Sequence, residues 1–563
     1  MAIGNDQRAG GDASVYTLDH DRPVVPEYRA LAGDLRDRVD GEVMFDEYAQ
    51  VLYATDGSIY QARPAGVVAP ENVDDIRAAV EVATAYEVPI LPRGAGSSLA
   101  GQAVGPGCVV LDFTRYMDDI VEVDPDAQQA TVRPGVVQDH LDAALDEYGL
   151  KFPPDPASSN RATVGGGIGN NSTGAHSVRY GITDAYTEEL RVVLANGELI
   201  HTREVVLDSE EYEAIVSADT REAALYETVR ELVADNREEI EERYPSLKRS
   251  VSGYNLHKVT YENDDGQQVI NLSKLFVGAE GTLGVIVEAT LSLVTKPDRT
   301  ALALYCFEDL IDALKAVPEA LEYPVSAVEL MDDEVFRLAA ESDGYAEYVE
   351  SIPEGTAAAL MLEWDDELVP ADGIRDGAAD GTTDGGAASE AVPTGESQDT
   401  QRAAFESAIA DTNAHFVDEG AAFDVIEAYT EADQGNVWKL RKAAIPLLMS
   451  LEGDPKPYPF IEDATVPPAE LAEYVGKFED VLQDHDTSAA YFAHAGSGTL
   501  HIRPILNLKD EEGVEALNSI TDDVTDLVLE HHGAFSGEHT TGWPGRSSTP
   551  RCTARSSGRR SRS

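Results

Sequence analysis

A stretch rich in glycine and serine, PRGAGSSLAGQAVG at residues 92–105, constrains the fold of this chain more than any other segment. Short apolar runs flank it at 88–91 and 108–113, so the sequence predicts a loop between two strands. Its glycines permit positive φ and close approach of a ligand, and its serines add hydroxyl donors to exposed N–H groups. This is the chemistry of a phosphate cradle with the Arg93 cation at its edge.

Two common nucleotide-binding motifs are excluded at this loop. A Rossmann fingerprint would need glycine at the position of Leu99, and a helix where the apolar run from Cys108 begins. A P-loop would need a following Gly-Lys-Ser/Thr, which the sequence lacks. Taken alone, such a loop is more often a plain surface turn.

The surrounding sequence alternates between strand and helix patterns and predicts a mixed α and β domain. An Asn196-Gly197 turn predicts a strand pair over about 190–200, and strongly charged helical sequence follows to about 244. The other predicted elements are strands at 67, 88, 108, 120–123 and 130–132 and helices over about 72–86 and 138–148.

Two further glycine clusters lie downstream of the first. FPPDPASSNRATVGGGIGNNSTGAHSVRYG, 152–181, predicts an unusually long structureless loop, which favours a binding surface. The alternative is a flexible linker, but Val164 and Ile168 interrupt it with apolar anchors. In LFVGAEGTLGVIVEATLSLV, 275–294, a short glycine turn is predicted between two apolar strands. The three loops could converge on one extended ligand.

Together these segments resemble the flavin-binding domain of the vanillyl-alcohol oxidase type, also called the p-cresol methylhydroxylase (PCMH) type, over roughly 62–298. The resemblance implies an α+β domain of two subdomains with FAD bound non-covalently between them and its pyrophosphate on the first loop. His176 is then expected to be a structural polar residue rather than a flavin attachment point. The implied FAD-binding residues are Pro92, Arg93, Gly94, Ala95, Gly96, Ser97, Ser98, Gly101, Pro154, Asp155, Ser158, Thr163, Gly166, Gly167, Gly169, Asn170, Gly174, Glu280, Gly281, Gly284 and Ile286.

Candidate catalytic side chains lie in three segments of the C-terminal half. Arg441 falls in a helical stretch, where its guanidinium could hold a carboxylate or form an ordinary surface salt bridge. His494 and His501 are predicted on the two strands of one hairpin, and Glu538 and His539 follow a long acidic helix. Two histidines and a carboxylate can form a catalytic divalent-metal site, although this histidine spacing is common by chance.

This half resembles the cap and substrate domain of FAD-linked D-2-hydroxyacid dehydrogenases, a group that contains D-lactate and D-2-hydroxyglutarate dehydrogenases and the glycolate oxidase flavin subunit. FIEDATVPP and LHIRPILNLKD are most similar to large members fused to an iron–sulfur region. The resemblance implies that His494, His501 and Glu538 bind a zinc-like ion. It also implies His539 as base and Arg441 as carboxylate ligand, and the nearest counterpart of a family lysine is Lys456.

The implied reaction is oxidation of D-lactate, D-2-hydroxyglutarate or glycolate to the 2-oxo acid by hydride transfer to flavin. No NAD fingerprint is present, so an iron–sulfur protein or a quinone chain is expected to reoxidise the flavin. Two alternatives stay open. One is another oxidase reaction on the same fold, with a sugar or an aromatic alcohol, and the other is a catalytically impaired flavin-binding chain.

The expected organisation has four parts. These are an N-terminal leader and helical segment over 1–61, the PCMH-type FAD-binding domain over 62–298, the cap domain over 299–539 with a disordered insertion at 366–402, and a basic tail over 540–563. The tail holds six arginines and no acid. Our hypothesis is a frameshift after about His539, and the alternative is a genuine basic tail.

Charge narrows the class of partner and the setting. Asp and Glu number 104 against 42 Lys and Arg, a net charge of −62, which opposes nucleic-acid binding. Because the acids lie in segments with apolar periodicity, we expect a folded protein with an acidic coat from a salt-loving organism, or else an acidic mesophile protein. Three scattered cysteines and no long apolar run favour a reduced cytoplasmic setting, with at most peripheral membrane contact.

Overall fold

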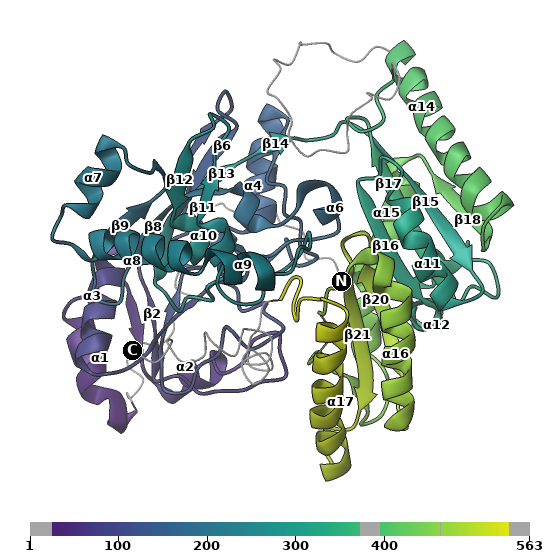
Figure 1. The fold of residues 1–563 in the computed structure, drawn as a ribbon. Helices are drawn as coiled ribbons and strands as arrows, with labels where there is room; N and C mark the ends of the chain where they lie inside the picture. Colours follow the sequence, from purple (N-terminus) through teal and green to yellow (C-terminus); the bar gives the residue numbers. More distant parts are fainter. Residues whose placement is uncertain (1–24, 372–394, 462, 540–563) are drawn as a thin grey trace, which may run out of the picture.

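The computed structural model describes residues 25–371, 395–461 and 463–539, in two α+β halves that follow one another along the chain (Figure 1). The first half ends with β14 (Val294–Thr295), and the second begins with β15 (Thr300–Phe307). The expected α+β class is confirmed. The expected leader and the basic tail lie outside the described residues, so they stay predictions.

A four-stranded sheet in the order β1-β2-β4-β3 forms the first subdomain. Its central strands are parallel, and α1 and α3 pack on it around Leu35, Ile76 and Leu111. Asn72 caps α3 by accepting the N–H of Asp75 at 3.0 Å. The elements are α1 (Arg29–Arg36), β1 (Glu42–Met44), α2 (Glu47–Leu52), β2 (Gly66–Ala69), α3 (Val73–Ala85), β3 (Ile90–Arg93) and β4 (Val109–Asp112). The first glycine loop joins β3 to β4, as the sequence predicts.

The second subdomain is a five-stranded antiparallel sheet in the order β5-β6-β13-β8-β9. Gly197, at φ 82°, makes the predicted turn between β8 and β9. Helices α4 and α5 bury Leu141 and Ile168 against the sheet. The bounds are β5 (Ile120–Asp124), β6 (Gln129–Val132), α4 (Gln138–Leu145), β7 (Leu150–Lys151), α5 (Val164–Asn170), α6 (Ser177–Tyr180), β8 (Thr187–Val193), β9 (Leu199–Thr202) and β13 (Val285–Ser292).

The charged segment between β9 and β13 forms helices, as predicted, on a small sheet of order β10-β12-β11. Helix α8 packs Tyr226 and Val229 into the core of this layer. The elements are β10 (Glu204–Val206), α7 (Glu210–Val216), α8 (Arg221–Asp235), α9 (Arg237–Arg243), β11 (Thr260–Glu262), β12 (Gln268–Asn271) and α10 (Ser273–Phe276).

Two loop predictions are wrong. Residues 152–181 are not one structureless loop, because they contain α5 and α6. Thr163 caps α5 by accepting the N–H of Gly166 at 3.2 Å, and buried Val164 and Ile168 hold this glycine-rich helix against the sheet. The third glycine turn follows α10 rather than a strand.

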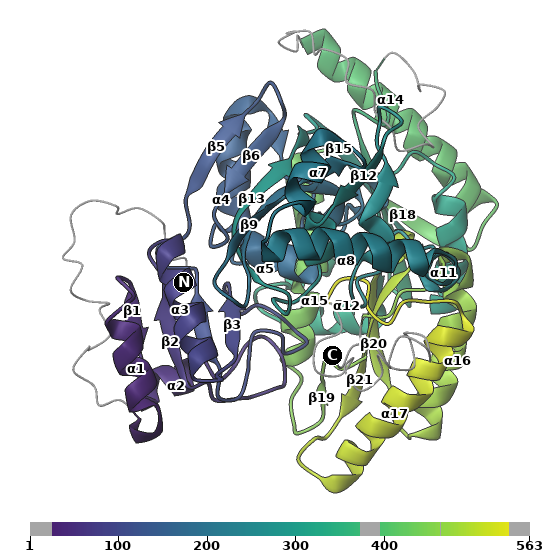
Figure 2. The ribbon, with the colours of Figure 1, turned by 60° about the vertical axis from the view of Figure 1, so that its left-hand side comes forward.

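A seven-stranded antiparallel sheet of order β18-β15-β17-β16-β20-β21-β19 organises the second half. Helices α11, α14, α16 and α17 cover one face, and α12 and α15 pack on the other. Figure 2 shows α16 and α17 alongside β20 and β21. The bounds are α11 (Leu310–Ala320), β16 (Ala327–Asp332), α12 (Asp333–Ala340), α13 (Ala346–Val349), β17 (Ala358–Asp365), α14 (Gly395–Asn413), β18 (Ala422–Ala428), α15 (Glu431–Met449), β19 (Lys456–Pro457), α16 (Leu471–Asp484), β20 (Ala489–His494), β21 (Thr499–Leu506) and α17 (Glu511–Glu530).

The disordered insertion expected at 366–402 is wrong at its C-terminal end. Residues 395–402 begin α14, which buries Phe405 and Ile409 in the core. Gln401 joins this helix to the segment after β17 by donating to the carbonyl of Val369 at 2.6 Å. Residues 372–394 lie outside the described part of the chain. Among the described helices, none combines the length and the apolar character that crossing a bilayer requires.

Candidate functional site

One cavity of about 490 Å³ is lined by both halves of the molecule. The three glycine loops line it from the first half, and α15, β20, β21 and the segment after α17 line it from the second. Most of the residues expected to bind FAD lie on this lining, namely Pro92, Arg93, Gly94, Ala95, Gly96, Ser97, Ser98, Ser158, Thr163, Gly166, Gly167, Gly169, Asn170, Glu280, Gly281, Gly284 and Ile286. Arg441, His494, His501, Glu538 and His539 line the same cavity.

Glycine backbone forms part of the first-half wall of the cavity. A Cβ added at Gly169 would meet nothing within 4 Å, and one at Gly167 would only reach Ser172 Oγ at 4.0 Å. By contrast, a Cβ on Gly94 would lie 2.0 Å from Thr163 Oγ1. The first two glycine loops can therefore pack against each other only because Gly94 has no side chain. This wall therefore offers a bare surface on which an extended ligand can lie close to peptide groups.

Arg93 does not act as a free cation at the edge of the cradle. Its guanidinium donates to the carbonyl oxygens of Ala103 at 2.7 Å and Thr55 at 2.9 Å, and it lies over the Tyr53 ring. Burial lowers its pKa, although Asp56 and Asp112 oppose this. The side chain therefore fixes the shape of the first loop.

Four residues expected at the cofactor, Gly101, Pro154, Asp155 and Gly174, are not on the cavity lining that the described residues form. Gly174 lies where a Cβ would come within 2.0 Å of the Asp155 carbonyl oxygen. Asp155 pairs with the ring of His176, which also contacts Glu363 of β17 at 2.6 Å. Burial lowers the pKa of His176, but the two carboxylates outweigh it and raise that pKa to about 10. His176 thus joins the two halves.

The second-half wall carries buried ionisable side chains on rigid strands. The predicted hairpin is formed by β20 and β21, with Phe492 paired to His501 and the turn closed by Gly498 at φ 78°. His494 Nδ1 lies 2.8 Å from Glu329 Oε1, and its Nε2 lies 3.2 Å from Glu538 Oε2. The Nε2 of His501 approaches the same oxygen at 3.5 Å.

This cluster has the donor set of a divalent-metal site. The ligand atoms of His494, His501 and Glu538 lie within 4.8 Å of one another, and all three residues are buried. Burial alone would raise the pKa of Glu538, but hydrogen bonds to the two imidazoles hold it well below its usual range. Two imidazoles and an ionised carboxylate are the ligands that catalytic zinc takes, so these residues fit such an ion.

Arg441 projects from α15 into the same cavity. Its Nε donates to Glu329 Oε2 at 2.8 Å, and its guanidinium stacks over Phe492 with 5.1 Å to the ring centroid. Lys456, the expected second cation, is not on the cavity lining, because its Nζ turns to the carbonyl of Leu451. Lys442, next to Arg441, lines the cavity in its place.

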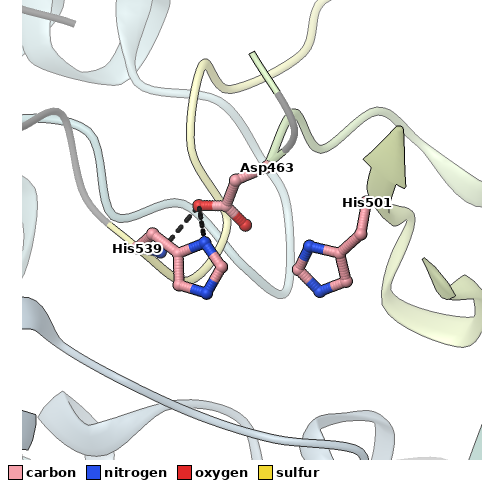
Figure 3. Close-up of side chains that lie close together, drawn as sticks. All are labelled: Asp463, His501 and His539. Atoms are coloured by element: carbon pink, nitrogen blue, oxygen red, sulfur yellow. Dashed lines mark hydrogen bonds and ion pairs between the residues drawn. The ribbon is translucent and has the colours of Figure 1, made fainter. Parts of the chain in front are cut away.

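Three residues that contact the candidate site were not identified from the sequence. Glu329 lies on β16 between Arg441 and His494, which outweigh burial and lower its pKa. Asp463 accepts the backbone N–H groups of Glu538 at 3.0 Å and His539 at 2.6 Å, as Figure 3 shows for His539. Arg249, fully buried, donates to Ser177 Oγ at 2.8 Å and lies 3.7 Å from Glu538 Oε2. Of these, only Asp463 lies in a segment with a sequence signal, FIEDATVPP.

The fold is that of the p-cresol methylhydroxylase type, as two solved structures show. The chain resembles a solved structure of 4-ethylphenol oxidase from Gulosibacter chungangensis, with a TM-score of 0.60, 14% identity and coverage of 92% of this chain and 90% of that one. It also resembles p-cresol methylhydroxylase with substrate bound, with a TM-score of 0.58, 14% identity and the same coverage. At this identity the similarity shows the fold alone.

Family models match most of the chain. The FAD binding domain model matches residues 64–203, and the model of the C-terminal domain of FAD linked oxidases matches residues 296–551. The chain therefore carries an FAD binding domain followed by the C-terminal domain of FAD linked oxidases.

Curated relatives in this family act on 2-hydroxy acids, as their names state. The chain is 32% identical over 511 residues to D-2-hydroxyglutarate dehydrogenase of Pseudomonas putida, covering 89% of this chain and 47% of that protein. It is 28% identical over 513 residues to glycolate oxidase subunit GlcD of Bacillus subtilis, covering 90% and 87%. It is also 26% identical to D-lactate dehydrogenase of Anaerostipes hadrus, covering 92% and 88%. The chain therefore spans about half the length of the first of these relatives.

Proposed function

We propose that this chain is the flavin-containing part of a D-2-hydroxyacid dehydrogenase, which oxidises D-lactate, D-2-hydroxyglutarate or glycolate to the 2-oxo acid. The observation that carries the proposal is the single cavity lined by the glycine loops together with Arg441, His494, His501, Glu538 and His539. A hydride acceptor on one wall would face the hydroxyl-bearing carbon held at the other.

The chain's own residues divide the work between binding and proton transfer. Arg441 neutralises the substrate carboxylate, which matters because a net charge of −62 opposes capture of an anion. His539, whose backbone is fixed by Asp463, accepts the hydroxyl proton. When bound, FAD supplies the hydride acceptor, and a zinc-like divalent ion at His494, His501 and Glu538 supplies a Lewis acid for the hydroxyl oxygen.

The proposed electron acceptor is an iron–sulfur protein or a quinone chain, with the reaction placed in the cytoplasm or at a membrane surface. Two observations support this part of the proposal: the chain carries both domains of FAD linked oxidases, and no NAD fingerprint occurs in its sequence.

Anaerobic flavin reduction tests the proposal directly. Protein loaded with FAD and zinc is mixed with D-lactate, D-2-hydroxyglutarate or glycolate, and the loss of oxidised-flavin absorbance is followed. We expect bleaching by at least one of the three acids; where that acid is lactate or 2-hydroxyglutarate, its L-enantiomer should cause none. His494→Ala should abolish the bleaching without loss of FAD. If none of the three acids reduces the flavin, the proposed reaction is wrong.

A further inference from the structure

Asp463 holds the segment that carries two of the functional side chains. Its Oδ2 accepts the N–H groups of Glu538 and His539, and it also contacts the hydroxyl of Ser536. Its backbone carbonyl accepts the N–H of Gly537 at 2.8 Å. One carboxylate oxygen and one carbonyl therefore fix the path of the chain from 536 to 539.

The second carboxylate oxygen of Asp463 is unused. Oδ1 is buried and has no hydrogen-bond partner among the described residues, and Asp463 as a whole is only 7% exposed. Figure 3 shows this oxygen turned toward the ring of His501. Ligand atoms of Asp463, His501 and His539 lie within 4.8 Å of one another. A buried carboxylate oxygen without a donor is costly, so the geometry calls for a partner at this point.

Two partners fit Oδ1, namely a second cation or an N–H of His501. A second cation would share His501 with the site at His494 and Glu538, so both ring nitrogens would have to be ligands and the ring would have to give up its last N–H proton. Donation of that proton to Oδ1 needs no such step. It leaves Nε2, which already lies 3.5 Å from Glu538 Oε2, as the metal-facing nitrogen.

The neighbouring histidine already has this arrangement. His494 places Nδ1 at 2.8 Å from Glu329 Oε1 and Nε2 at 3.2 Å from Glu538 Oε2. A carboxylate behind a metal-binding imidazole fixes its tautomer and orientation, and removing it typically weakens metal binding about 10- to 100-fold. Asp463 and His501 have ligand atoms within 4.8 Å of each other, so a small shift would give Asp463 the position behind His501 that Glu329 has behind His494.

We propose that Asp463 accepts the Nδ1–H of His501 and thereby keeps Nε2 of that ring available to a divalent metal. The inference rests on the metal site of the proposed function, and it makes Asp463 a positioning residue. The same carboxylate then orients His501 through one oxygen and anchors Glu538 and His539 through the other.

Asp463→Asn separates these two roles. The amide oxygen can still accept the N–H groups of Glu538 and His539, but the amide nitrogen then faces His501 and favours the tautomer whose Nε2 carries the proton. We expect zinc affinity of the FAD-loaded protein to fall about 10- to 100-fold, measured by dialysis against zinc buffers with metal analysis. In the X-ray absorption spectrum of zinc bound at high concentration, the number of imidazole ligands should drop from two to one.

Ser536→Ala is the matched control, because it removes a contact with Oδ2 and leaves Oδ1 untouched. It should keep zinc affinity within about twofold of the wild-type value, well short of the loss expected on removing an outer carboxylate. Equal losses of zinc affinity in Asp463→Asn and Ser536→Ala would show that Asp463 only anchors the loop, which would overturn the inference. Should Asp463→Asn lose its FAD, Asp463→Ser, whose shorter side chain does not reach the ring, takes its place in the same measurements.

The other possible outcomes of these measurements also test the inference. Zinc affinity and imidazole count unchanged in Asp463→Asn would overturn the inference. Two zinc ions in the wild type, with one lost in this variant, would replace it with a second metal site. A wild type that binds no zinc would overturn both the inference and the metal part of the proposed function. A wild type that binds zinc through His494, but whose flavin no 2-hydroxy acid reduces, would overturn the proposed reaction alone.

Discussion

The two walls of the cavity differ in the kind of chemical group that they carry. The wall from the first half carries the glycine loops, where a position such as Gly169 presents no side chain to a ligand. The wall from the second half carries buried ionisable side chains, and the fully buried Glu329 lies behind it between Arg441 and His494. We therefore expect added side-chain atoms to disturb the first wall, and removal of charged groups to disturb the second. Substitutions of each kind test this contrast.

The largest effect is expected from His539→Ala, which removes the proposed proton acceptor. Loss of a general base typically lowers the rate about 100- to 10,000-fold. The rate of anaerobic flavin reduction should fall by this amount while the substrate concentration for half-maximal rate changes little. His485→Asn, on a ring that is not on the cavity lining, should react at the wild-type rate. A His539→Ala enzyme of undiminished rate would contradict the assignment of the base.

Glu329→Gln should be next in size and should act on stability. It leaves Arg441 and His494 without the carboxylate that both contact. Breaking a buried charge pair typically costs about 3–5 kcal/mol, and denaturant unfolding would measure it. Glu341→Gln breaks an exposed pair with Arg337, and the expected change there is below about 1 kcal/mol. Equal changes in unfolding free energy in Glu329→Gln and Glu341→Gln would show that the buried charges of this wall contribute no more to stability than an exposed pair.

His176→Gln should have a pH-dependent effect. The pKa of His176 is about 10 in the folded protein, because Asp155 and Glu363 outweigh burial, whereas an unfolded histidine titrates near pH 6.5. Its charge therefore stabilises the fold fully below about pH 6.5, and this contribution is lost as the pH rises through about 10. The gap in unfolding free energy between wild type and variant should narrow over this range. A constant gap would show that the ring contributes by packing alone.

The smallest effect is expected on the glycine wall. A Cβ at Gly94 would collide with Thr163 Oγ1, which caps α5, so Gly94→Ala should weaken FAD binding about tenfold through a strain of about 1–3 kcal/mol. Fluorescence titration with FAD would measure this. Gly33→Ala on α1, where a Cβ meets nothing within 4 Å, should leave FAD affinity unchanged. Tighter FAD binding by Gly94→Ala would contradict this interpretation of the glycine wall.

The two walls also differ in how much of each could be predicted from the sequence. The glycine loops were found because clustered glycines between apolar runs are a local signal. Their internal structure was not, because α5 owes its helix to Thr163 at its start and to the burial of Val164 and Ile168, which no local pattern of glycines reveals. Tertiary packing overrode low helix propensity here.

On the charged wall, side-chain type and hairpin spacing pointed to His494, His501, Glu538 and His539. Glu329 and Arg249 had no such signal, because a single acid among 104, or one arginine in a loop, looks like any surface charge until strands and loops are packed together. Lys456 was chosen by its position in the chain, and β19 turns its side chain toward Leu451 instead.

His176 sets how the two walls can move. It lies between a carboxylate of the first half and one of the second, and separating the halves would leave a partly buried imidazolium without at least one of them. Arg179 adds contacts to Asp365 and Glu367 beside it. The spacing between the glycine wall and the charged wall is thus established once, when the chain folds. Any ligand of the cavity must then enter and leave between two walls whose spacing these contacts hold fixed.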